Sequence, residues 1–486
     1  MTKRDRFDCI IVGAGIAGIA AAERLSALGQ RVLLVESRKK LGGRASSFTD
    51  VRSGDILDNC QHLALGCCTN FTTLLARLGT ADKLAWHQSQ YWREPGGRES
   101  VISCRGLLGR FPAPSHYGAG LLMAHFLTLS EKAALIVAVA EIMGTDRVAW
   151  RGETFAAFLS YCQQPARLIQ RFWEPVVASA CNLDCSKVAA SSALHVFQEG
   201  FFSTRDAASL GIPTCPLSDL FASLGTLLAQ RGSELRLGVL VQSVSPTSIT
   251  IARTGEQICA DRVICAVPHE HATGLVAAES QHEDARFAAM RTFGSSPIVG
   301  VHLQFDRPVL RTPHVVLVDR PTQWLFATDH HLSPSGITTR GARLCAVISA
   351  ADGWMELDEA AMVGRVAEDL RECVPESAGA TLLWGRAIKE RRATIAPTPA
   401  MEACRPGATV PGADLSRADG MILAGDYTNT GWPSTMEGAT RSGLIAAAAV
   451  VGYESDALLT PSLRVAPLAA LLGVRHPVGT GAPGYN

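Results

Sequence analysis

The sequence has no excess of charge of either sign. Lys plus Arg and Asp plus Glu both number 45 in 486 residues, which gives a formal net charge of +0 at pH 7. A neutral chain has no long-range field to attract a polyanion, so no nucleic-acid partner is expected. Charged residues make up only 19% of the chain, whereas hydrophobic residues reach 47%. This balance excludes a disordered chain and indicates apolar surface beyond the needs of a core.

The sequence also lacks paired cysteines. Its 14 cysteines are scattered from Cys9 to Cys404 without a CxxC pair. A chain of this length does not need disulfides to hold its core, so a reducing cytosolic compartment is expected. Neither Cys67-Cys68 nor the pair Cys181 and Cys185 has Cys or His partners at zinc spacing, and no metal site is predicted.

Hydrophobic runs long enough to cross a bilayer are absent as well. The uncharged run Cys9–Ala22 is shorter than the ~18 residues that a span needs, and its glycines indicate a strand, turn and helix instead of a signal peptide. The segment Leu107–Met143 is mostly apolar, but Arg110, His125 and residues 130–132 divide it. Its two pieces can lie in a membrane interface or form core helices of a cap, and both interpretations stay open.

The first 36 residues predict a strand, a helix and a second strand. Phe7–Val12 and Arg31–Glu36 are apolar enough for buried strands, and Ile16–Leu28 is an Ala-rich helix. Such a unit implies a parallel sheet with helices on its faces. Short strand-like runs over 237–266 predict a β-meander that returns to the same sheet. Alternation that resumes at Ile298–Phe305 predicts a second sheet.

A GxGxxG motif fills the first turn of this unit, from Gly13 to Gly18. Its glycines let the backbone approach a pyrophosphate, whose charge the helix N-terminus stabilises. The second strand ends in Glu36, where a carboxylate can bind ribose hydroxyls. The motif in this context therefore predicts a dinucleotide site. Its predicted residues are Gly13, Gly15, Ile16, Ala17, Gly18, Glu36 and Ser37.

Three further motifs select the dinucleotide. Leu41–Arg44 adds a second glycine turn and a guanidinium; Met421–Asp426 predicts a buried strand with an acid at its tip, and Pro433–Gly438 opens a helix. Together they resemble FAD enzymes of the amine oxidase and carotenoid desaturase superfamily. The helix N-terminus would stabilise negative charge on the reduced ring. The resemblance implies FAD contacts from Gly42, Gly43, Arg44, Gln61, Val241, Gly425, Asp426, Thr435, Met436 and Glu437.

These motifs predict an α/β protein with a Rossmann-like FAD-binding domain and a discontinuous substrate-binding domain of mixed sheet plus helices. Only one dinucleotide motif has the required context, so electrons are expected to come from an external donor. The predicted ranges are 1–63, 226–275 and 415–452 for the FAD-binding domain, 64–225 for a mainly helical substrate- and membrane-facing region, 276–414 for the substrate-binding domain and 453–486 for a C-terminal tail.

Several segments resemble one subgroup, the hydroxysqualene dehydroxylases, also called squalene-associated FAD-dependent desaturases. The matching segments are Asp58–His62, Leu210–Pro213, Pro216–Leu220, Gln323–Phe326 and Arg392–Thr394. Cys60 stands where the subgroup usually has glycine, and cysteine is small enough to be tolerated there. The resemblance implies an FAD-dependent oxidoreductase in which hydroxysqualene loses its hydroxyl and gains hydride, giving squalene in hopanoid biosynthesis.

Departure of the hydroxyl needs an acid within hydrogen-bonding reach, and the candidates by motif are Asp58 and His62. Each has a structural alternative, since Asp58 can bond a backbone turn and His62 can be a half-buried structural histidine. Glu437 is expected to act as a helix-first-turn residue and not as an acid.

Three other functions stay open on the same scaffold. An oxidative desaturase of a carotenoid-like polyene differs only in the direction of electron flow. A flavin amine oxidase would need an aromatic cage, for which six tyrosines leave little material, although Trp432 could supply one wall. A prenyl-lipid binding protein would share the fold without flavin chemistry, and the intact FAD motifs argue against it.

The implied substrate also predicts where the protein acts. Releasing a thirty-carbon isoprenoid into water would cost on the order of 20 kcal/mol at ~0.8 kcal/mol per carbon, so uptake is expected at the bilayer. We therefore expect a cytoplasmic protein that associates peripherally with the inner face of the cell membrane. Leu121, Leu122 and Phe126 are the residues expected to contribute apolar surface to this contact.

Overall fold

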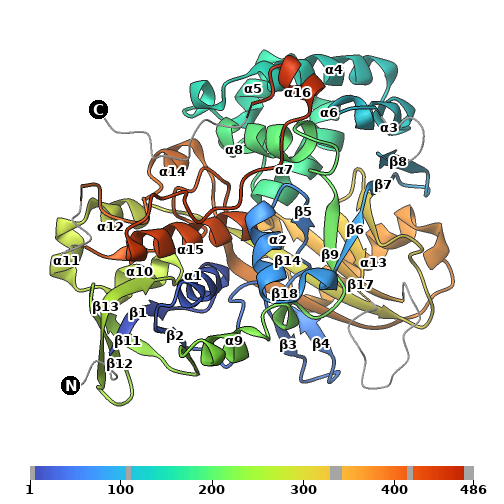
Figure 1. The fold of residues 1–486 in the computed structure, drawn as a ribbon. Coiled ribbons are helices and arrows are strands. Elements are labelled where there is room, and N and C mark those ends of the chain that lie inside the picture. Colours follow the sequence, from blue (N-terminus) through green and yellow to red (C-terminus); the bar gives the residue numbers. More distant parts are fainter. Residues whose placement is uncertain (1–5, 105–110, 329–341, 413–419, 476–486) are drawn as a thin grey trace.

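The computed structural model describes residues 6–104, 111–328, 342–412 and 420–475. Within these residues, two seven-stranded sheets form the frame of the molecule (Figure 1). Two small sheets, β3–β4 and β5–β9–β6, lie beside this frame. Their strands are β3 Ser47–Thr49, β4 Ile56–Asp58, β5 Ala64–Leu65, β6 Leu84–His87 and β9 Leu210–Pro213.

The first sheet confirms the predicted Rossmann-like unit. Its parallel strands run in the order β10–β2–β1–β13, with β19 on the other side of β13, and β11 and β12 complete an antiparallel meander. Nearly every residue of β1 and β2 is buried, as expected for strands covered on both faces. The strands are β1 Phe7–Val12, β2 Val32–Glu36, β10 Glu234–Leu237, β11 Val241–Val244, β12 Ser248–Ile251, β13 Gln257–Cys265 and β19 Ile422–Leu423.

Two helices far apart in sequence pack together on this sheet, namely α1 (Ile16–Ala27) and α15 (Met436–Val451). Their closest approach is at Gly443, where a Cβ atom would lie 2.1 Å from the carbonyl oxygen of Ala17. Because only glycine allows this approach, it fixes the last predicted piece of the FAD-binding domain against the first. Five other helices border this domain: α2 Thr69–Arg77, α9 Leu224–Gln230, α10 His269–Leu275, α11 Ala278–Glu283 and α12 Ala285–Met290.

The second sheet has the order β18–β14–β17–β16–β15–β7–β8. One face packs on α13 (Glu359–Cys373), and the other packs on the helical region. The two longest strands, β14 and β18, pair antiparallel along most of their length. The strands are β7 Ser89–Arg93, β8 Glu99–Ser103, β14 Ser295–Phe305, β15 His314–Leu317, β16 Trp324–Ala327, β17 Arg343–Ser349 and β18 Leu382–Ile395.

The helical region lies on the side of the molecule away from the first sheet (Figure 1). It includes π-helical segments at Ile169–Trp173 and Val196–Phe202, a rare geometry that is frequent at functional sites. Among the described residues, none of the helices has the length and hydropathy needed to span a bilayer. The helices are α3 Gly118–Met123, α4 Leu129–Gly144, α5 Phe155–Tyr161, α6 Ala166–Leu168, α7 Glu174–Cys181 and α8 Ala190–His195, with α14 Pro399–Ala403 elsewhere.

The structure departs from two of the predicted ranges and from one predicted surface residue. The range 64–225 is not a separate helical unit, because α2 packs against α15 while β7 and β8 extend the second sheet. The predicted tail contains α16 (Pro467–Leu471), which packs into the core of the helical region. Phe126, expected at the membrane, is fully buried and stacks on Trp92 at 5.0 Å between ring centroids. The start of the apolar segment, 107–110, lies outside the described residues.

Candidate active site

A single continuous cavity of about 770 Å³ links the two sheets. It begins at the carboxyl ends of the parallel strands, which is where ligands bind in open α/β sheets. Gly13 and Glu36 line this end, Arg44 and Thr435 line the middle, and Trp324 lies near the far end. All the predicted cofactor residues border the cavity except Gly18, which lies inside the turn.

The glycine loop has the shape that a pyrophosphate requires. Gly13 has a φ of +104°, and a Cβ atom there would lie 2.7 Å from the carbonyl oxygen of Ala266. A Cβ on Gly18 would lie only 1.9 Å from the carbonyl oxygen of Gly13, so Gly18 keeps α1 against the loop. Gly15, the N-cap of α1, borders the cavity and has open space beside it. The first-turn N–H groups of α1 are thereby accessible to an anion.

Glu36 connects the two turns that surround the nucleotide end. One carboxylate oxygen accepts from the backbone N–H of Ala14 at 2.8 Å, and the other accepts from the N–H of Arg38 at 2.8 Å and the Ser37 hydroxyl at 3.1 Å. The carboxylate therefore orders the glycine loop as well as bordering the cavity. Val241, at the start of β11, lines the same end.

An ion pair joins the predicted motifs from opposite ends of the chain. The Arg44 guanidinium donates to Asp426 at 2.5 Å and to the carbonyl oxygen of Ala393 at 2.7 Å. Burial raises the pKa of Asp426, but Arg44, Ser434 and Arg405 outweigh it, so the pKa of this carboxyl lies below its usual value. Asp426 is consequently ionised at neutral pH and holds the guanidinium at the middle of the cavity.

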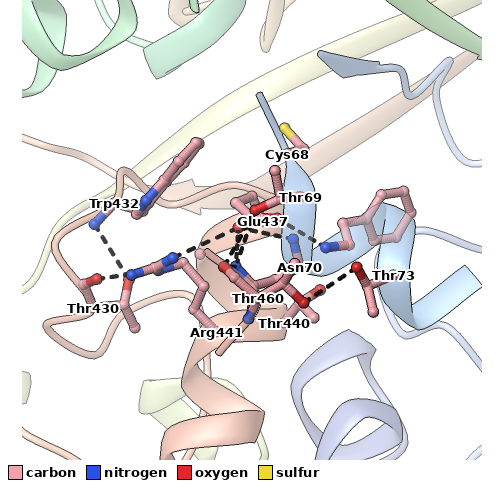
Figure 2. Close-up of polar contacts among 12 residues, drawn as sticks. Cys68, Thr69, Asn70, Thr73, Thr430, Trp432, Glu437, Thr440, Arg441 and Thr460 are labelled. Atoms are coloured by element: carbon pink, nitrogen blue, oxygen red, sulfur yellow. Dashed lines mark hydrogen bonds and ion pairs between the residues drawn. The ribbon is translucent and has the colours of Figure 1, made fainter. Parts of the chain in front are cut away.

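The start of α15 also lines this middle section, and Figure 2 shows the polar contacts that its Glu437 makes with Asn70. Thr435 is the N-cap, and its hydroxyl accepts from the backbone N–H of Gly438 at 3.1 Å. Glu437 is fully buried and accepts from the Asn70 side chain and the Phe71 backbone N–H, both at 2.8 Å. Burial raises the pKa of Glu437. Its carboxylate caps α2 from another helix, in agreement with a first-turn role.

Of the two candidate acids, His62 lines the cavity and Asp58 does not. The Nδ1 atom of His62 lies 2.9 Å from the carbonyl oxygen of Cys60. A carbonyl only accepts, so Nδ1 carries the proton and the neutral ring leaves Nε2 as an acceptor. Burial lowers the pKa of His62, which favours the neutral ring at pH 7. This geometry does not suit His62 to donate a proton. The neighbouring Gln61 lines the cavity and donates to the carbonyl of His62 at 3.0 Å.

Asp58 fits the structural alternative. Its Oδ1 atom accepts from the Ser47 hydroxyl at 2.6 Å and from the backbone N–H of Leu217 at 3.0 Å, so it ties the β3–β4 hairpin to the segment after β9. The side chain is 1% exposed, and burial raises its pKa to about 6. The motif thus marks a structural crosslink, and direct contact between Asp58 and a substrate is not supported.

We expect Asp58→Asn to fold and bind FAD normally, because an amide oxygen can accept the same two hydrogen bonds. Asp58→Ala should destabilise the protein by about 2–4 kcal/mol, since it leaves two buried donors unpaired. The native pKa of about 6 exceeds the unfolded value of 3.8, so the carboxyl contributes most stability below about pH 4 and loses it as pH rises to 6. Thermal unfolding of both variants from pH 4 to 7 checks this; a stable Asp58→Ala protein would contradict it.

Residues 16–451 match the model of a family described as flavin containing amine oxidoreductase. The chain belongs to this family. FAD is its cofactor, and the residues present fit that group: a glycine loop at a helix N-terminus, an acid at the end of β2 and a second helix start border one cavity. The chain is therefore an FAD-dependent oxidoreductase.

The relatives that align with this chain carry the names of different enzymes. A hydroxysqualene dehydroxylase of Rhodopseudomonas palustris is 26% identical over 445 residues, covering 89% of this chain and 96% of the relative. A 15-cis-phytoene desaturase of an Oncidium hybrid cultivar is 24% identical over 460 residues, covering 91% and 78%. A solved putrescine oxidase bound to putrescine has a TM-score of 0.67 at 16% identity, covering 92% of this chain and 99% of that one. This last likeness shows the fold alone.

Sequence reasoning missed a polar group that lines the cavity beside Trp432. His195, at the end of α8, and Glu199, in the π-helical segment, line the cavity although both are about 95% buried. Arg147 donates to both side chains. The signal in the sequence is a His and a Glu four residues apart in a mostly apolar stretch, which is too common to single out.

Proposed function

We propose that the protein reductively removes the hydroxyl of hydroxysqualene to give squalene in hopanoid or triterpenoid biosynthesis. The observation that carries this proposal is the apolar lining of the cavity beyond the cofactor residues. This lining comes from α7, the π-helical segment and the second sheet, and suits a long hydrocarbon. Its apolar residues are Leu63, Leu65, Val176, Ala180, Val196, Phe201, Leu210, Ile298, Trp324, Phe326 and Val347.

The hydroxysqualene dehydroxylase relatives support this substrate, because they align over nearly their whole length. In the proposed reaction FAD, reduced by an external electron donor, supplies the hydride. The residues of the chain hold the hydrocarbon in the apolar lining, exclude water from it and fix the polar middle section through Arg44 and Asp426. Departure of the hydroxyl needs hydrogen-bond donors within the same enclosure.

A desaturase of a carotenoid-like polyene is the second candidate, since phytoene and zeta-carotene desaturases are also among the relatives. The amine oxidase function is less suited to the cavity. Among the described residues that line it, none is a tyrosine. The buried carboxylates near Trp432 are also matched by cations, Glu199 by Arg147 and Glu437 by Arg441, so they offer no net charge to an ammonium.

Anaerobic incubation of photoreduced protein with hydroxysqualene tests the proposed function. Squalene is the expected product, and it can be identified by gas chromatography with mass spectrometry. Oxidised protein incubated with phytoene tests the second candidate, for which a longer conjugated polyene would be the product.

We further propose that the protein is cytoplasmic and associates with the inner face of the cell membrane. The proposed substrate makes uptake from the bilayer necessary, and apolar side chains are exposed together on α3, α4 and α16. These helices lie close together, since Lys132 on α4 donates to the carbonyl of Leu122 and Gly473 contacts Gly144. They occupy one end of the molecule (Figure 1). The exposed residues are Leu122, Met123, Leu129, Ile136, Val137 and Leu471.

Combining Leu122→Glu, Leu129→Glu and Ile136→Glu should lower liposome binding at least ten-fold and leave the flavin spectrum intact. All three side chains are more than half exposed, and inserting each would contribute about 2 kcal/mol. Flotation with liposomes measures the loss. Leu383→Glu, an equally exposed leucine on β18, is the matched control and should float like wild type. Unchanged flotation of the triple variant would contradict the membrane contact.

A further inference from the structure

His195 and Glu199 form a buried polar site inside the otherwise apolar part of the cavity. The exposed fractions are 5% for His195 and 4% for Glu199, and both line the cavity. Asn182, another polar residue that lines the cavity, is committed to structural bonds: its amide donates to Ser296 and Thr394 and accepts from the N–H of Ala350. Burying a histidine and a carboxylate against a hydrocarbon is costly, so their position needs a function.

Arg147 fixes the hydrogen-bonding roles of both side chains. Its guanidinium approaches Nδ1 of His195 at 2.7 Å and Oε1 of Glu199 at 3.3 Å. A guanidinium only donates, so Nδ1 must be the acceptor and the proton of the neutral ring is on Nε2. Glu199 also accepts from this guanidinium, so its side chain acts as an acceptor. His195 thus differs from His62, whose Nδ1 carries the ring proton.

The charges around this site balance. Arg147 neutralises Glu199, and Arg441 lies 3.9 Å from Glu437. The Trp432 ring contacts a member of each group, with the His195 ring at 4.6 Å and the Arg441 guanidinium carbon at 5.7 Å from its centroid. Because the net charge is zero and a donor stands beside an acceptor, the site is complementary to a neutral group that both donates and accepts.

We propose that His195 and Glu199, positioned by Arg147, bind the hydroxyl group of the isoprenoid substrate. The Nε2–H of His195 donates to the hydroxyl oxygen, and the carboxylate of Glu199 accepts the hydroxyl proton. An alcohol can bond both groups at once, in addition to Arg147, whereas a pure hydrocarbon can bond neither. This inference deepens the proposed function and rests on it for the identity of the alcohol.

Such a site would also decide between alcohol and hydrocarbon ligands. A hydroxyl adds hydrogen bonds with His195 and Glu199 that a hydrocarbon cannot form, so a site with this donor and acceptor favours the alcohol over an analogue that lacks the hydroxyl. We expect the oxidised holoenzyme to bind hydroxysqualene about 10- to 100-fold more tightly than squalene. The same preference would help product release, because squalene has no hydroxyl to bond with His195 and Glu199.

The test is a comparison of hydroxysqualene and squalene binding to oxidised holoenzyme in detergent micelles, followed by tryptophan fluorescence and by the flavin spectrum. His195→Phe keeps a ring beside Trp432 but removes the donor, and Glu199→Leu removes the acceptor; each should reduce the preference to within about three-fold of unity. His195→Gln can accept from Arg147 and still donate, so it should retain most of the preference. His116→Phe, a fully buried histidine that does not line the cavity, is the matched control.

Equal affinities of the wild type for the two ligands would overturn the inference, as would a His195→Phe protein that keeps the full preference. Loss of preference in both His195→Gln and His195→Phe would also overturn it, because ring shape and not hydrogen bonding would then be responsible. Since these measurements need no turnover, a wild type that prefers the alcohol but forms no squalene would reject the proposed function while leaving the binding site in place.

Discussion

Replacing Gly18 with alanine is expected to abolish FAD binding. The new Cβ atom would lie 1.9 Å from the carbonyl oxygen of Gly13 and 3.1 Å from its carbonyl carbon. Both are backbone atoms of the loop that borders the cavity, so α1 would have to move away from the loop. The strain costs at least the ~1–3 kcal/mol of an overpacked site, and the displaced helix start no longer meets the pyrophosphate. Flavin absorbance per protein and thermal unfolding measure both effects.

Two other glycines provide controls for this experiment. Gly364→Ala lies within α13, where nothing would contact the Cβ, and it should be neutral or slightly stabilising. Gly15→Ala also has open space beside it, but that space borders the cavity, so it should fold normally and bind FAD more weakly. A stable, fully yellow Gly18→Ala protein would show that the loop can move without losing the cofactor.

The reduced protein is expected to form squalene from hydroxysqualene, and the oxidised protein is expected to leave squalene and phytoene unchanged. The hydroxyl gains one proton and leaves as water, and one hydride takes its place on carbon. The reaction therefore requires a two-electron reductant. Departure builds positive charge on the hydrocarbon, which an apolar cavity alone would not stabilise. Hydrogen bonds to the departing oxygen assist this step, and the Nε2–H of His195 is a donor that the cavity offers.

Isotope labelling separates this reaction from its alternatives. Deuterium placed at flavin N5 should appear in the squalene product, and single-turnover formation should match the amount of reduced cofactor. Squalene that forms without the label would exclude direct hydride transfer. Conversion of phytoene by oxidised protein would instead assign the chain to the desaturases. A reduced sample that binds the alcohol but forms neither product would reject the squalene assignment.

Local sequence was sufficient for the nucleotide half of the molecule. The glycine loop, Glu36 and the acid at Asp426 each follow directly from a buried strand, and the carboxyl ends of parallel strands meet at one edge of a sheet. For the same reason the β-meander could be predicted from short apolar runs. The strand β18 could not, because its stretch of Lys, Glu and Arg residues has no clear alternation and is stabilised by pairing with β14.

The tertiary structure decided the roles of the other candidates. Asp58 belongs to a motif that suggested chemistry, but its bonds to Ser47 and Leu217 connect distant segments and give it a structural role. Phe126 has the same apolar character as Leu122, and only packing buries the first and exposes the second. His195 and Glu199 acquire their hydrogen-bonding roles from Arg147, which reaches them from another segment. The role of a side chain can be predicted from sequence where its neighbours along the chain position it. Where distant segments position the side chain, only the tertiary structure determines its role.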